Sequence, residues 1–556
     1  MSSSMYPMWT REVKLSHRRL DPLGLSRVSQ WTTDQLLPGI TSVTNVARNY
    51  SFYSWAIGNL LKENKVTQRA QFAEQLTKRE AAFVIASIFH EEGKAVKLNP
   101  HGYDKAIRFI NKAKDGRYQV AFNVSDSNSE GFYGLYYKTP MSRLGLTARS
   151  RLFDDLTPLG GDLAGFYEEN IKNTQYLTDH VQDEDVEKEV LSEYGGHACI
   201  CQLVQPSGER DLLREIMLSK NYRSAVLEKS RRETLGLVLY LVKQCRELGI
   251  DFNGNGFRDF VYFRQVTNGE SVFDVDLKCF GEIASRWRLF QLHEYLTYAL
   301  ESLLHAILCE LKRKDEGLSL DAFLRLIVDP AGLISAKLMV SSSANFEELV
   351  DSVISNNLGM KGLSRESSIE FGDRCNLQVA VSEKTVFKAL QEANAGSNLQ
   401  EIVADSLAIL ILNYIRAFYL LSNVDPVTLW FNNRAIVEWS PVYFAQEIRS
   451  KAATWSIDGI VRYFFKTIIE RHDLIAYEKL LSGNDTFRFE EKAGRLRFKM
   501  DIYPNYPRQR SSRISSAVSI LEQLGLVEVE NKIKLLTVDG EKFLGACLNE
   551  GSNRSN

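Results

Sequence analysis

Residues 512–548 read SRISSAVSILEQLGLVEVENKIKLLTVDGEKFLGACL, and this stretch says most about the fold. Its first part has apolar residues at intervals of four, three and three, a spacing that predicts one buried face of a helix. Ser512 can cap the start of this helix, and Gly525 is suited to its end. The side chains expected in the core are Ile514, Val518, Leu521 and Leu524.

The residues that follow predict a hairpin and a second helix. Residues 526–535 alternate between apolar and polar on both sides of a polar turn, as the strands of a hairpin do. Thr537 can cap a final amphipathic helix over 539–548. This order of helix, hairpin and helix resembles the winged-helix fold. The resemblance implies a C-terminal winged-helix domain at 441–549, followed by a disordered tail at 550–556.

The junction before the last helix has a counterpart near the other end of the chain. Residues 156–163 and 536–543 both read LTxxG, then two residues and an apolar one. Because a strand-like stretch precedes each copy, the match suggests a second winged-helix-like domain at 66–172. Within it we expect a helix over 72–92, and strands over 118–124 and 132–137.

The remaining segments complete the expected organisation. Pro and Gly residues interrupt the first part of the chain, which favours an irregular arm over 1–65. Residues 173–440 are expected to form a helical middle domain with long helices over 225–248, 282–313 and 399–421. The expected fold class is therefore mainly α with small β hairpins, in several domains.

Composition limits the classes of function. The 556 residues include 68 Lys and Arg against 70 Asp and Glu, a net charge of −2. No global basic field draws the chain to nucleic acid, so any such contact must come from a local patch. Seven scattered cysteines favour a reducing cytoplasm. The start of the chain lacks the apolar stretch of a secretory signal, and no apolar run is long enough for a membrane span.

A local basic patch lies between Asp485 and Arg513, where eight basic residues stand against four acidic ones. Residues 486–500 alternate around Ala493-Gly494 and predict a second hairpin with Arg495, Arg497 and Lys499 on one face. Such a ribbon could lie along a phosphate backbone, whereas the alternative is a solubilising face. The residues expected to bind DNA are Arg488, Arg495, Arg497, Lys499, Arg508, Arg510 and Arg513.

The helix over 512–524 is a weaker candidate for DNA recognition. The face opposite its apolar stripe is small and mostly neutral, and the hairpin after it carries two Glu and two Lys. Phosphate neutralisation supplies most non-specific affinity for DNA, and this surface offers little of it. The hairpin fits docking against a protein equally well. The residues on the face expected to be exposed are Ser512, Ser516, Ser519, Ile520 and Gln523.

Catalytic signatures are missing from the sequence. It contains no GxxxxGK[ST], no GxSxG and no HExxH, so we assign no catalytic residue, no metal and no cofactor.

Two groups of possible metal ligands are better explained without a metal ion. His197, Cys199 and Cys201 alternate along an apolar stretch and favour burial in the core. The second group lies opposite a leucine stripe and favours a solvated or partner-facing surface: Glu294, Glu301, His305 and Cys309.

One partial motif of a nuclease is present in the sequence. Asp276 and Lys278 are two residues apart in a strand-like run, and Asp259 lies upstream. In restriction-type nucleases two acidic groups hold a divalent metal and a lysine steadies the attacking water. A metal-dependent nuclease is therefore an alternative function, although the tripeptide is common by chance.

Residues 20–57 resemble a stretch of bacterial defence proteins encoded beside SMC-like or Rad50-like ATPases, of the Lamassu and Ddm type. The resemblance implies an accessory subunit that joins the ATPase and an effector nuclease without catalysing a reaction, and it transfers no catalytic residue. The expected partners are those subunits and DNA, bound without sequence preference, and no membrane. A winged-helix transcriptional regulator is a further alternative.

Overall fold

A computed structural model gives a mainly helical chain with small two-stranded antiparallel sheets, which confirms the expected fold class. In the part of the chain that is described, no helix is both long and apolar enough to cross a membrane. The structure describes residues 21–62, 68–92, 94, 100–113, 116–150, 152–204, 207–219, 225–268, 271–356, 381–422, 440–452, 454–481, 483–501 and 506–552.

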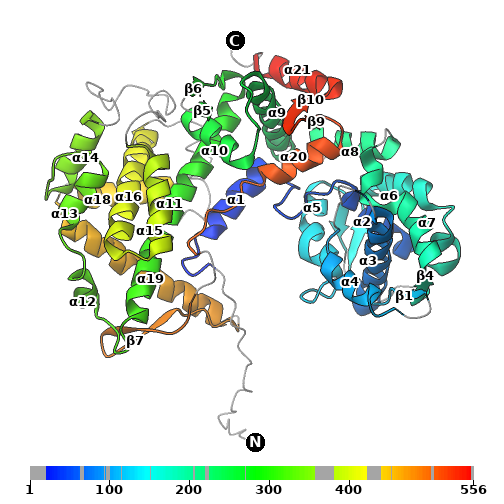
Figure 1. Ribbon diagram of the computed structural model, residues 1–556, viewed down its shortest axis with the longest axis horizontal. Helices are drawn as coiled ribbons and strands as arrows, with labels where there is room; N and C mark the ends of the chain where they lie inside the picture. Colours follow the sequence, from blue (N-terminus) through cyan, green and yellow to red (C-terminus); the bar gives the residue numbers. More distant parts are fainter. Residues whose placement is uncertain are drawn as a thin grey trace, which may run out of the picture. The chain divides into compact units, whose positions relative to one another are not determined.

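The chain forms two compact units, each assembled from segments distant in sequence (Figure 1). Unit 1 contains residues 1–32, 258–276 and 285–510. Unit 2 contains residues 33–257, 277–284 and 511–556. Residues 173–257, expected in the middle domain, thus lie in the same unit as the C-terminal residues.

Unit 1 is organised around two long buried helices, α11 (Gly281–Lys312) and α16 (Leu399–Ser422), which supply much of its apolar core. Both helices were predicted within two residues of their observed ends. Two further helices, α1 (Ser26–Leu36) and α10 (Gly254–Phe263), lie only partly in this unit. The helices wholly within it are α12 (Leu320–Leu324), α13 (Pro330–Lys337), α14 (Phe346–Asn356), α15 (Glu383–Gly396), α18 (Pro441–Ala452) and α19 (Ile457–Leu481). Its hairpins are β5 (Gln265–Asn268) with β6 (Ser271–Asp274), and β7 (Phe489–Lys492) with β8 (Arg495–Phe498).

Unit 2 contains α2 (Arg48–Lys62), most of whose side chains are buried and which packs against α6 and α3. The other long helices are α3 (Arg69–Glu91), α6 (Pro158–Ile171), α7 (Lys188–Ala198), α8 (Gly208–Leu218), α9 (Ala225–Glu247), α20 (Ile514–Gln523) and α21 (Val538–Ser552). Shorter helical segments are α4 (Tyr103–Ile110), η1 (Tyr133–Tyr137), α5 (Lys138–Arg143), η2 (Tyr176–His180), η3 (Ile200–Val204) and η4 (Lys278–Phe280). The strands pair as β1 (Arg117–Gln119) with β4 (Asp185–Glu187), β2 (Thr147–Arg149) with β3 (Asp154–Leu156), and β9 (Val527–Glu530) with β10 (Ile533–Leu536).

The predicted C-terminal helix, hairpin and helix are present as α20, β9–β10 and α21, and we call them the C-terminal module. All four apolar side chains predicted in its core are buried. The prediction for its first cap was wrong. Ser512 does not cap α20, because Arg513 occupies the N-cap in the left-handed conformation and no side chain accepts a hydrogen bond there. The second cap is as predicted, since Thr537 Oγ1 accepts a hydrogen bond from Gly540 N.

The same geometry recurs in α5, β2–β3 and α6, which we call the N-terminal module. Thr157 Oγ1 accepts from Gly160 N at 3.1 Å and donates to Gly145 O at 2.5 Å. The corresponding atoms of Thr537 contact Gly540 N at 3.1 Å and Gly525 O at 2.8 Å. Gly145 and Gly525 both have positive φ and end the helix before each hairpin. The two LTxxG copies therefore have equivalent structures.

Two sequence expectations in the first 172 residues were wrong. Residues 132–137 are helical, with the π-helical segment η1 over Tyr133–Tyr137, and β1 pairs with β4 instead of with a neighbouring strand. Aromatic density favours strands, but here the rings fill the core beside α2: Tyr137 lies 4.9 Å from Tyr53 between ring centroids. The described part of the expected arm contains α1 and α2 and is largely buried, so it is part of both cores. Residues 1–20 and 553–556 lie outside the described residues.

The end of α1 and the residues between α1 and α2, together 34–47 and called here the connecting segment, contact both modules. Its Asp34 carboxylate accepts from Arg143 at the end of α5 and from Arg513 at the start of α20, at 2.8 and 2.6 Å. Further along, Asn45 O accepts from Ser519 and Gln523 of α20. This connecting segment belongs to the stretch that carries the resemblance to defence proteins, so the resemblance rests on residues with a structural role.

We predict opposite effects for alanine at two glycines of α21. A Cβ at Gly540 would lie 2.1 Å from Leu526 O, whereas a Cβ at Gly545 meets no atom within 4 Å. Gly540→Ala should therefore lower the free energy of unfolding by about 1–3 kcal/mol. Gly545→Ala should leave it unchanged or raise it by up to about 1 kcal/mol. Calorimetric unfolding of the full chain measures both.

The N-terminal module provides an independent repeat of the comparison. A Cβ at Gly160 would lie 2.1 Å from Leu146 O, whereas a Cβ at the adjacent Gly161 meets no atom within 4 Å. Gly160→Ala should destabilise in the same way as Gly540→Ala, with Gly161→Ala as its control. Equal effects of the crowded and open positions would contradict the equivalence of the modules.

Candidate functional site

The β7–β8 hairpin carries the clearest exposed basic surface among the residues predicted to bind DNA. The hairpin turns at Ala493-Gly494, as predicted, and both turn residues have positive φ. Its pairing places Lys492 opposite Arg495, and Glu490 opposite Arg497. The intervening Leu496 is buried, so the charged side chains share the outer face. We call Glu490, Lys492, Arg495, Arg497 and Lys499 the basic hairpin face.

The basic hairpin face carries more positive than negative charges. The hydrogen bond from Lys492 and the charges of Lys499 and Arg497 lower the pKa of Glu490, so this acid is ionised at neutral pH. Lys499 contacts Asp485 at 2.8 Å, and Arg495 lies 3.6 Å from the exposed Glu316. The pair of Arg495 with Glu316 is exposed and contributes little stability, so Arg495 can exchange this partner for phosphate at small cost. Lys499 instead pairs with a buried carboxylate, because Asp485 is buried.

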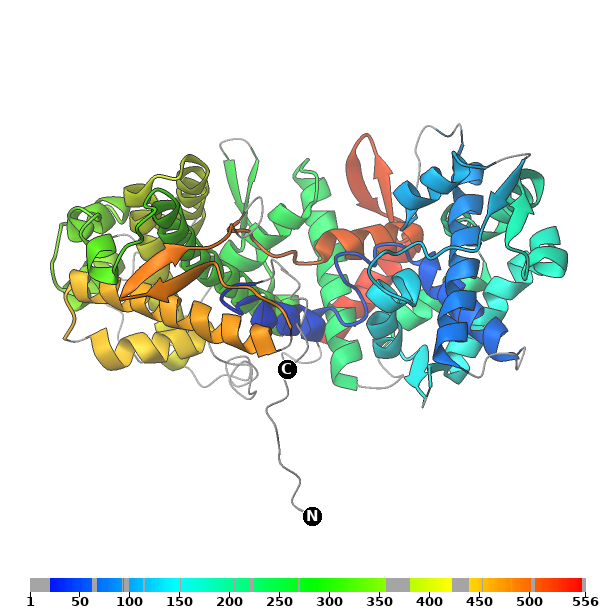
Figure 2. The ribbon, with the colours of Figure 1, turned by 90° about the horizontal axis from the view of Figure 1, so that it is seen from below.

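Contacts on both strands attach the β7–β8 hairpin to the rest of unit 1 (Figure 2). Phe489 stacks on His472 of α19 with 4.0 Å between ring centroids. On the other strand, Leu496 exchanges two backbone hydrogen bonds with Leu318, at 2.8 and 3.0 Å. Because contacts on both strands fix the backbone, the outer face presents its charges in a defined arrangement.

Three of the predicted DNA-binding arginines have internal partners instead. Arg488 is fully buried, and its Nη1 donates to Asp501 O at 3.1 Å. Arg513 binds Asp34 in unit 2, and Arg510 binds carboxylates inside unit 1. The remaining predicted residues, Arg495, Arg497, Lys499 and Arg508, are exposed. The sequence predicted a single patch, but the structure divides it into one outer face and several internal ion pairs.

Arg510 explains why one expectation for α11 was wrong. Glu294 and Glu301 were expected on a solvated or partner-facing surface, but both are fully buried. The Arg510 guanidinium binds Glu301. The backbone N of Arg510 donates a hydrogen bond to Glu294 Oε2 at 2.6 Å. Burial raises the pKa of Glu301 to about 7, against the opposing effect of Arg510. The charged stripe of α11 is thus neutralised by a distant part of the same chain. His305 and Cys309 lie together further along α11, with 3.4 Å between Nε2 and Sγ.

The polar face of α20 is covered within unit 2. Ser512, Ser516 and Ile520 of that face are buried, contrary to expectation. Gln523 donates to Asn45 O at 2.7 Å and accepts from Ala47 N at 2.8 Å. A helix covered in this way cannot insert into a major groove without first losing these contacts.

The Asp-x-Lys residues of the possible nuclease motif do not lie on one β-strand. β6 ends at Asp274, and Lys278 begins the 3-10 helix η4, so Asp276 and Lys278 do not share a strand face. Asp259 is bound by Lys384 at 2.6 Å, and burial raises its pKa. Among the described residues, the one cluster of at least three possible metal ligands includes none of these residues.

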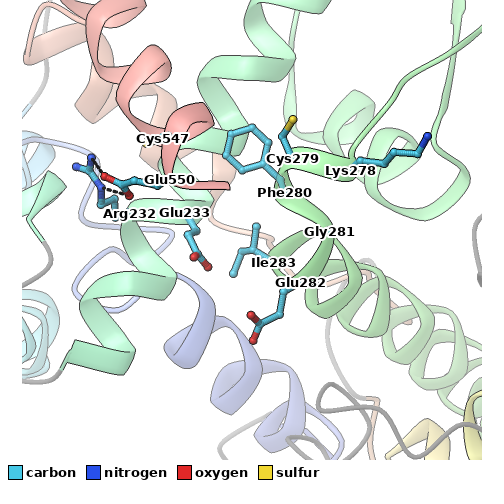
Figure 3. Close-up of a pocket in the computed structure, with 10 residues that line it drawn as sticks. All are labelled: Arg232, Glu233, Lys278, Cys279, Phe280, Gly281, Glu282, Ile283, Cys547 and Glu550. Carbon is cyan, nitrogen blue, oxygen red and sulfur yellow. Dashed lines mark hydrogen bonds and ion pairs between the residues drawn. The ribbon is translucent and has the colours of Figure 1, made fainter. Parts of the chain in front are cut away.

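A small pocket of about 210 Å³ lies near Lys278 in unit 2 (Figure 3). The Arg232 guanidinium on one side is paired with Glu550 at 3.1 Å. The Lys278 side chain extends away from that pair (Figure 3). The volume is below the usual range of ligand pockets, about 300–1,000 Å³, so this hollow does not define a substrate site.

The group His197, Cys199 and Cys201 is only partly as predicted. Cys199 is buried, as expected, but Cys201 is partly exposed in η3 and His197 is exposed at the end of α7. Two residues that the sequence analysis missed, His90 and Glu91 at the end of α3, lie beside the cysteines. The adjacent His-Glu pair was visible in the sequence, but nothing local linked it to cysteines more than 100 residues away.

Comparisons with protein-family models, curated proteins and solved structures find no match to this chain. The function is therefore inferred from the surfaces described above.

We predict that Arg510 stabilises the fold instead of binding DNA. Arg510→Leu leaves Glu301 buried without the guanidinium that binds it and should cost about 3–5 kcal/mol of stability. Arg497→Leu on the exposed hairpin face should change stability by no more than about 0.5 kcal/mol. Chemical unfolding of the full chain compares the two variants. Similar small losses would show that Arg510 is not needed to neutralise the buried acids.

We also predict that the purified chain neither cleaves DNA nor hydrolyses ATP. The sequence has no P-loop, and the Asp-x-Lys outline does not form a strand face. Plasmid incubated with magnesium should stay supercoiled, and ATP should release no phosphate. Magnesium-dependent cleavage that disappears in Lys278→Ala, but persists in the exposed control Lys542→Ala, would contradict this prediction.

Proposed function

We propose that this chain is a non-enzymatic accessory subunit that contacts DNA without sequence preference and holds partner proteins. In the form suggested by residues 20–57, it belongs to a bacterial defence complex and joins an SMC-like or Rad50-like ATPase to an effector nuclease in the cytoplasm. The single observation that carries the DNA contact is the basic hairpin face, because it combines exposure, fixed geometry and excess positive charge.

The hairpin face suits contact with the phosphate backbone. Lys492 and Arg495 are opposite each other in the ladder, with Cβ atoms about 5 Å apart, and Arg497 follows Arg495 on the same face of β8. Lys and Arg on such a ribbon can replace counterions along DNA, which provides affinity without reading bases. The overall charge of −2 adds no general attraction, so a local face of this kind must supply the binding energy.

An exposed apolar stripe on α19 supports the protein-binding part of the proposal. Leu474, Tyr477 and Leu481 are spaced as one helix face, and their exposed fractions are 59%, 60% and 91%. Monomeric proteins seldom leave large apolar side chains grouped on a helix face, and such stripes commonly mark interaction sites. The stripe thus offers a partner-binding surface on the same helix that supports the basic hairpin.

The alternative functions have less support. A winged-helix regulator needs a free recognition helix, whereas α20 is covered by residues 45–47. A nuclease of the restriction type needs Asp259 and Asp276 to share a metal, whereas Asp259 is paired with Lys384.

We predict that Arg495→Glu combined with Arg497→Glu weakens binding to every duplex alike. Each phosphate contact contributes about 0.9 to the slope of log affinity against log salt, so losing two contacts should reduce the slope by about 1.8. Fluorescence anisotropy with several unrelated duplexes across a salt series measures affinity and slope together.

A control variant has the same change of charge at the end of α2 and directly after α6, both in unit 2. Lys62→Glu combined with Lys172→Glu alters two exposed lysines that lie outside the hairpin face. This variant should keep the wild-type salt slope. Identical slopes for the hairpin variant and wild type would contradict the proposed contact, and strong preference for one duplex would favour the regulator.

A further inference from the structure

A cluster of four potential metal ligands lies where α3 and α7 end. His90 and Glu91 are the last residues of α3, and Cys199 follows α7, with Cys201 in the next turn. One ligand atom from each of the four lies within 4.8 Å of all the others. Cys199 and Glu91 are buried, whereas His90 and Cys201 are partly exposed. Every residue belongs to unit 2.

The packing of the two helices explains why these groups meet. Among the described helices, α3 and α7 make the most extensive contact, and they lie side by side in Figure 1. Gly195 permits this approach, because a Cβ there would lie 2.2 Å from Ala86 O. The same Cβ would lie 3.1 Å from His90 Cβ, so the close contact extends to the ligand cluster. Both helix C-termini direct partial negative charge towards it, which favours a cation.

We propose that His90, Glu91, Cys199 and Cys201 bind a structural zinc ion. Two thiolates, an imidazole and a carboxylate are ligands that zinc takes in tetrahedral sites. With bonds of about 2.0–2.3 Å, the ligand atoms of such a site are about 3.3–3.8 Å apart. The observed cluster needs a contraction of about 1 Å at its widest, within reach of side-chain rotations. Four protein ligands leave no open position, so the site is structural.

Charge balance and neighbouring contacts agree with this assignment. Zinc with two thiolates and one carboxylate has a net charge of −1, and Lys94 supplies the compensating positive charge. Its Nζ lies 2.9 Å from Glu91 Oε1 and 3.5 Å from Cys201 Sγ. The Gln202 side-chain amide lies 3.3 Å from His90 Nε2. With its oxygen turned towards the ring, this amide would accept the Nε2–H of a histidine that binds zinc through Nδ1, and so orient the ligand.

The backbone of Cys199 is also anchored. Arg48 Nη1 donates to Cys199 O at 2.5 Å, and the same guanidinium forms a fully buried ion pair with Glu209. One ligand is therefore held in place before metal arrives, which lowers the ordering cost of binding. A zinc ion here would tie the ends of α3 and α7 to the start of η3.

The test uses the full chain expressed with added zinc and dialysed against metal-free buffer. Mass spectrometry of the metals should find about one zinc per chain. Cobalt substituted for zinc should give a thiolate-to-cobalt charge-transfer band, which requires cysteine ligands. Removal of the metal with a chelator should lower the unfolding temperature. Absence of bound zinc and cobalt, or cobalt bound without the charge-transfer band, would overturn the proposal without relying on any variant.

Variants then assign the ligands. Cys201→Ser and His90→Ala should lose the zinc or bind it many-fold more weakly. Cys245→Ser, at a buried cysteine of α9, and His197→Ala, at an exposed histidine two residues from Cys199, should retain it. Zinc held as tightly by Cys201→Ser and His90→Ala as by wild type would overturn the assignment.

Discussion

The carboxylate of Asp34 binds Arg143 of the N-terminal module and Arg513 of the C-terminal module, and the organisation of unit 2 depends on this shared contact. The two guanidinium groups approach one partly buried acid from the end of α5 and the start of α20. Like charges at this distance repel unless an anion lies between them, so Asp34 allows the modules to meet. The rest of the connecting segment, through Asn45, then covers the polar face of α20.

The same principle operates in unit 1, where Arg510 neutralises two acids of α11. Half of the arginines predicted to bind DNA, namely Arg488, Arg510 and Arg513, instead stabilise the protein itself. Arg495, Arg497 and Arg508 remain exposed, and the first two lie on the basic hairpin face. A nearly neutral chain can thus combine a strongly charged interior with one local surface for an anion.

Local patterns predicted local structure well. The alternation around Ala493-Gly494 gave the β7–β8 hairpin, and the spacing from Ile514 gave α20, because both depend on neighbours within a few residues. Contacts between distant segments were not predictable. Glu301 meets a residue 209 positions away, and Glu91 meets Cys199 across 108 positions. No periodicity within either segment indicates such a partner. Glu301 was therefore assigned to a surface and Cys199 to the core from their own segments alone, and Glu91 was not identified.

The proposed DNA contact lies on the basic hairpin face and not on α20. Photo-cross-linking of the full chain to a duplex containing bromodeoxyuridine, followed by peptide mass spectrometry, distinguishes the two surfaces. We expect cross-links within residues 485–501, where Phe487 and Phe498 flank the basic residues. Cross-links concentrated in residues 512–524, with none at the hairpin, would contradict it.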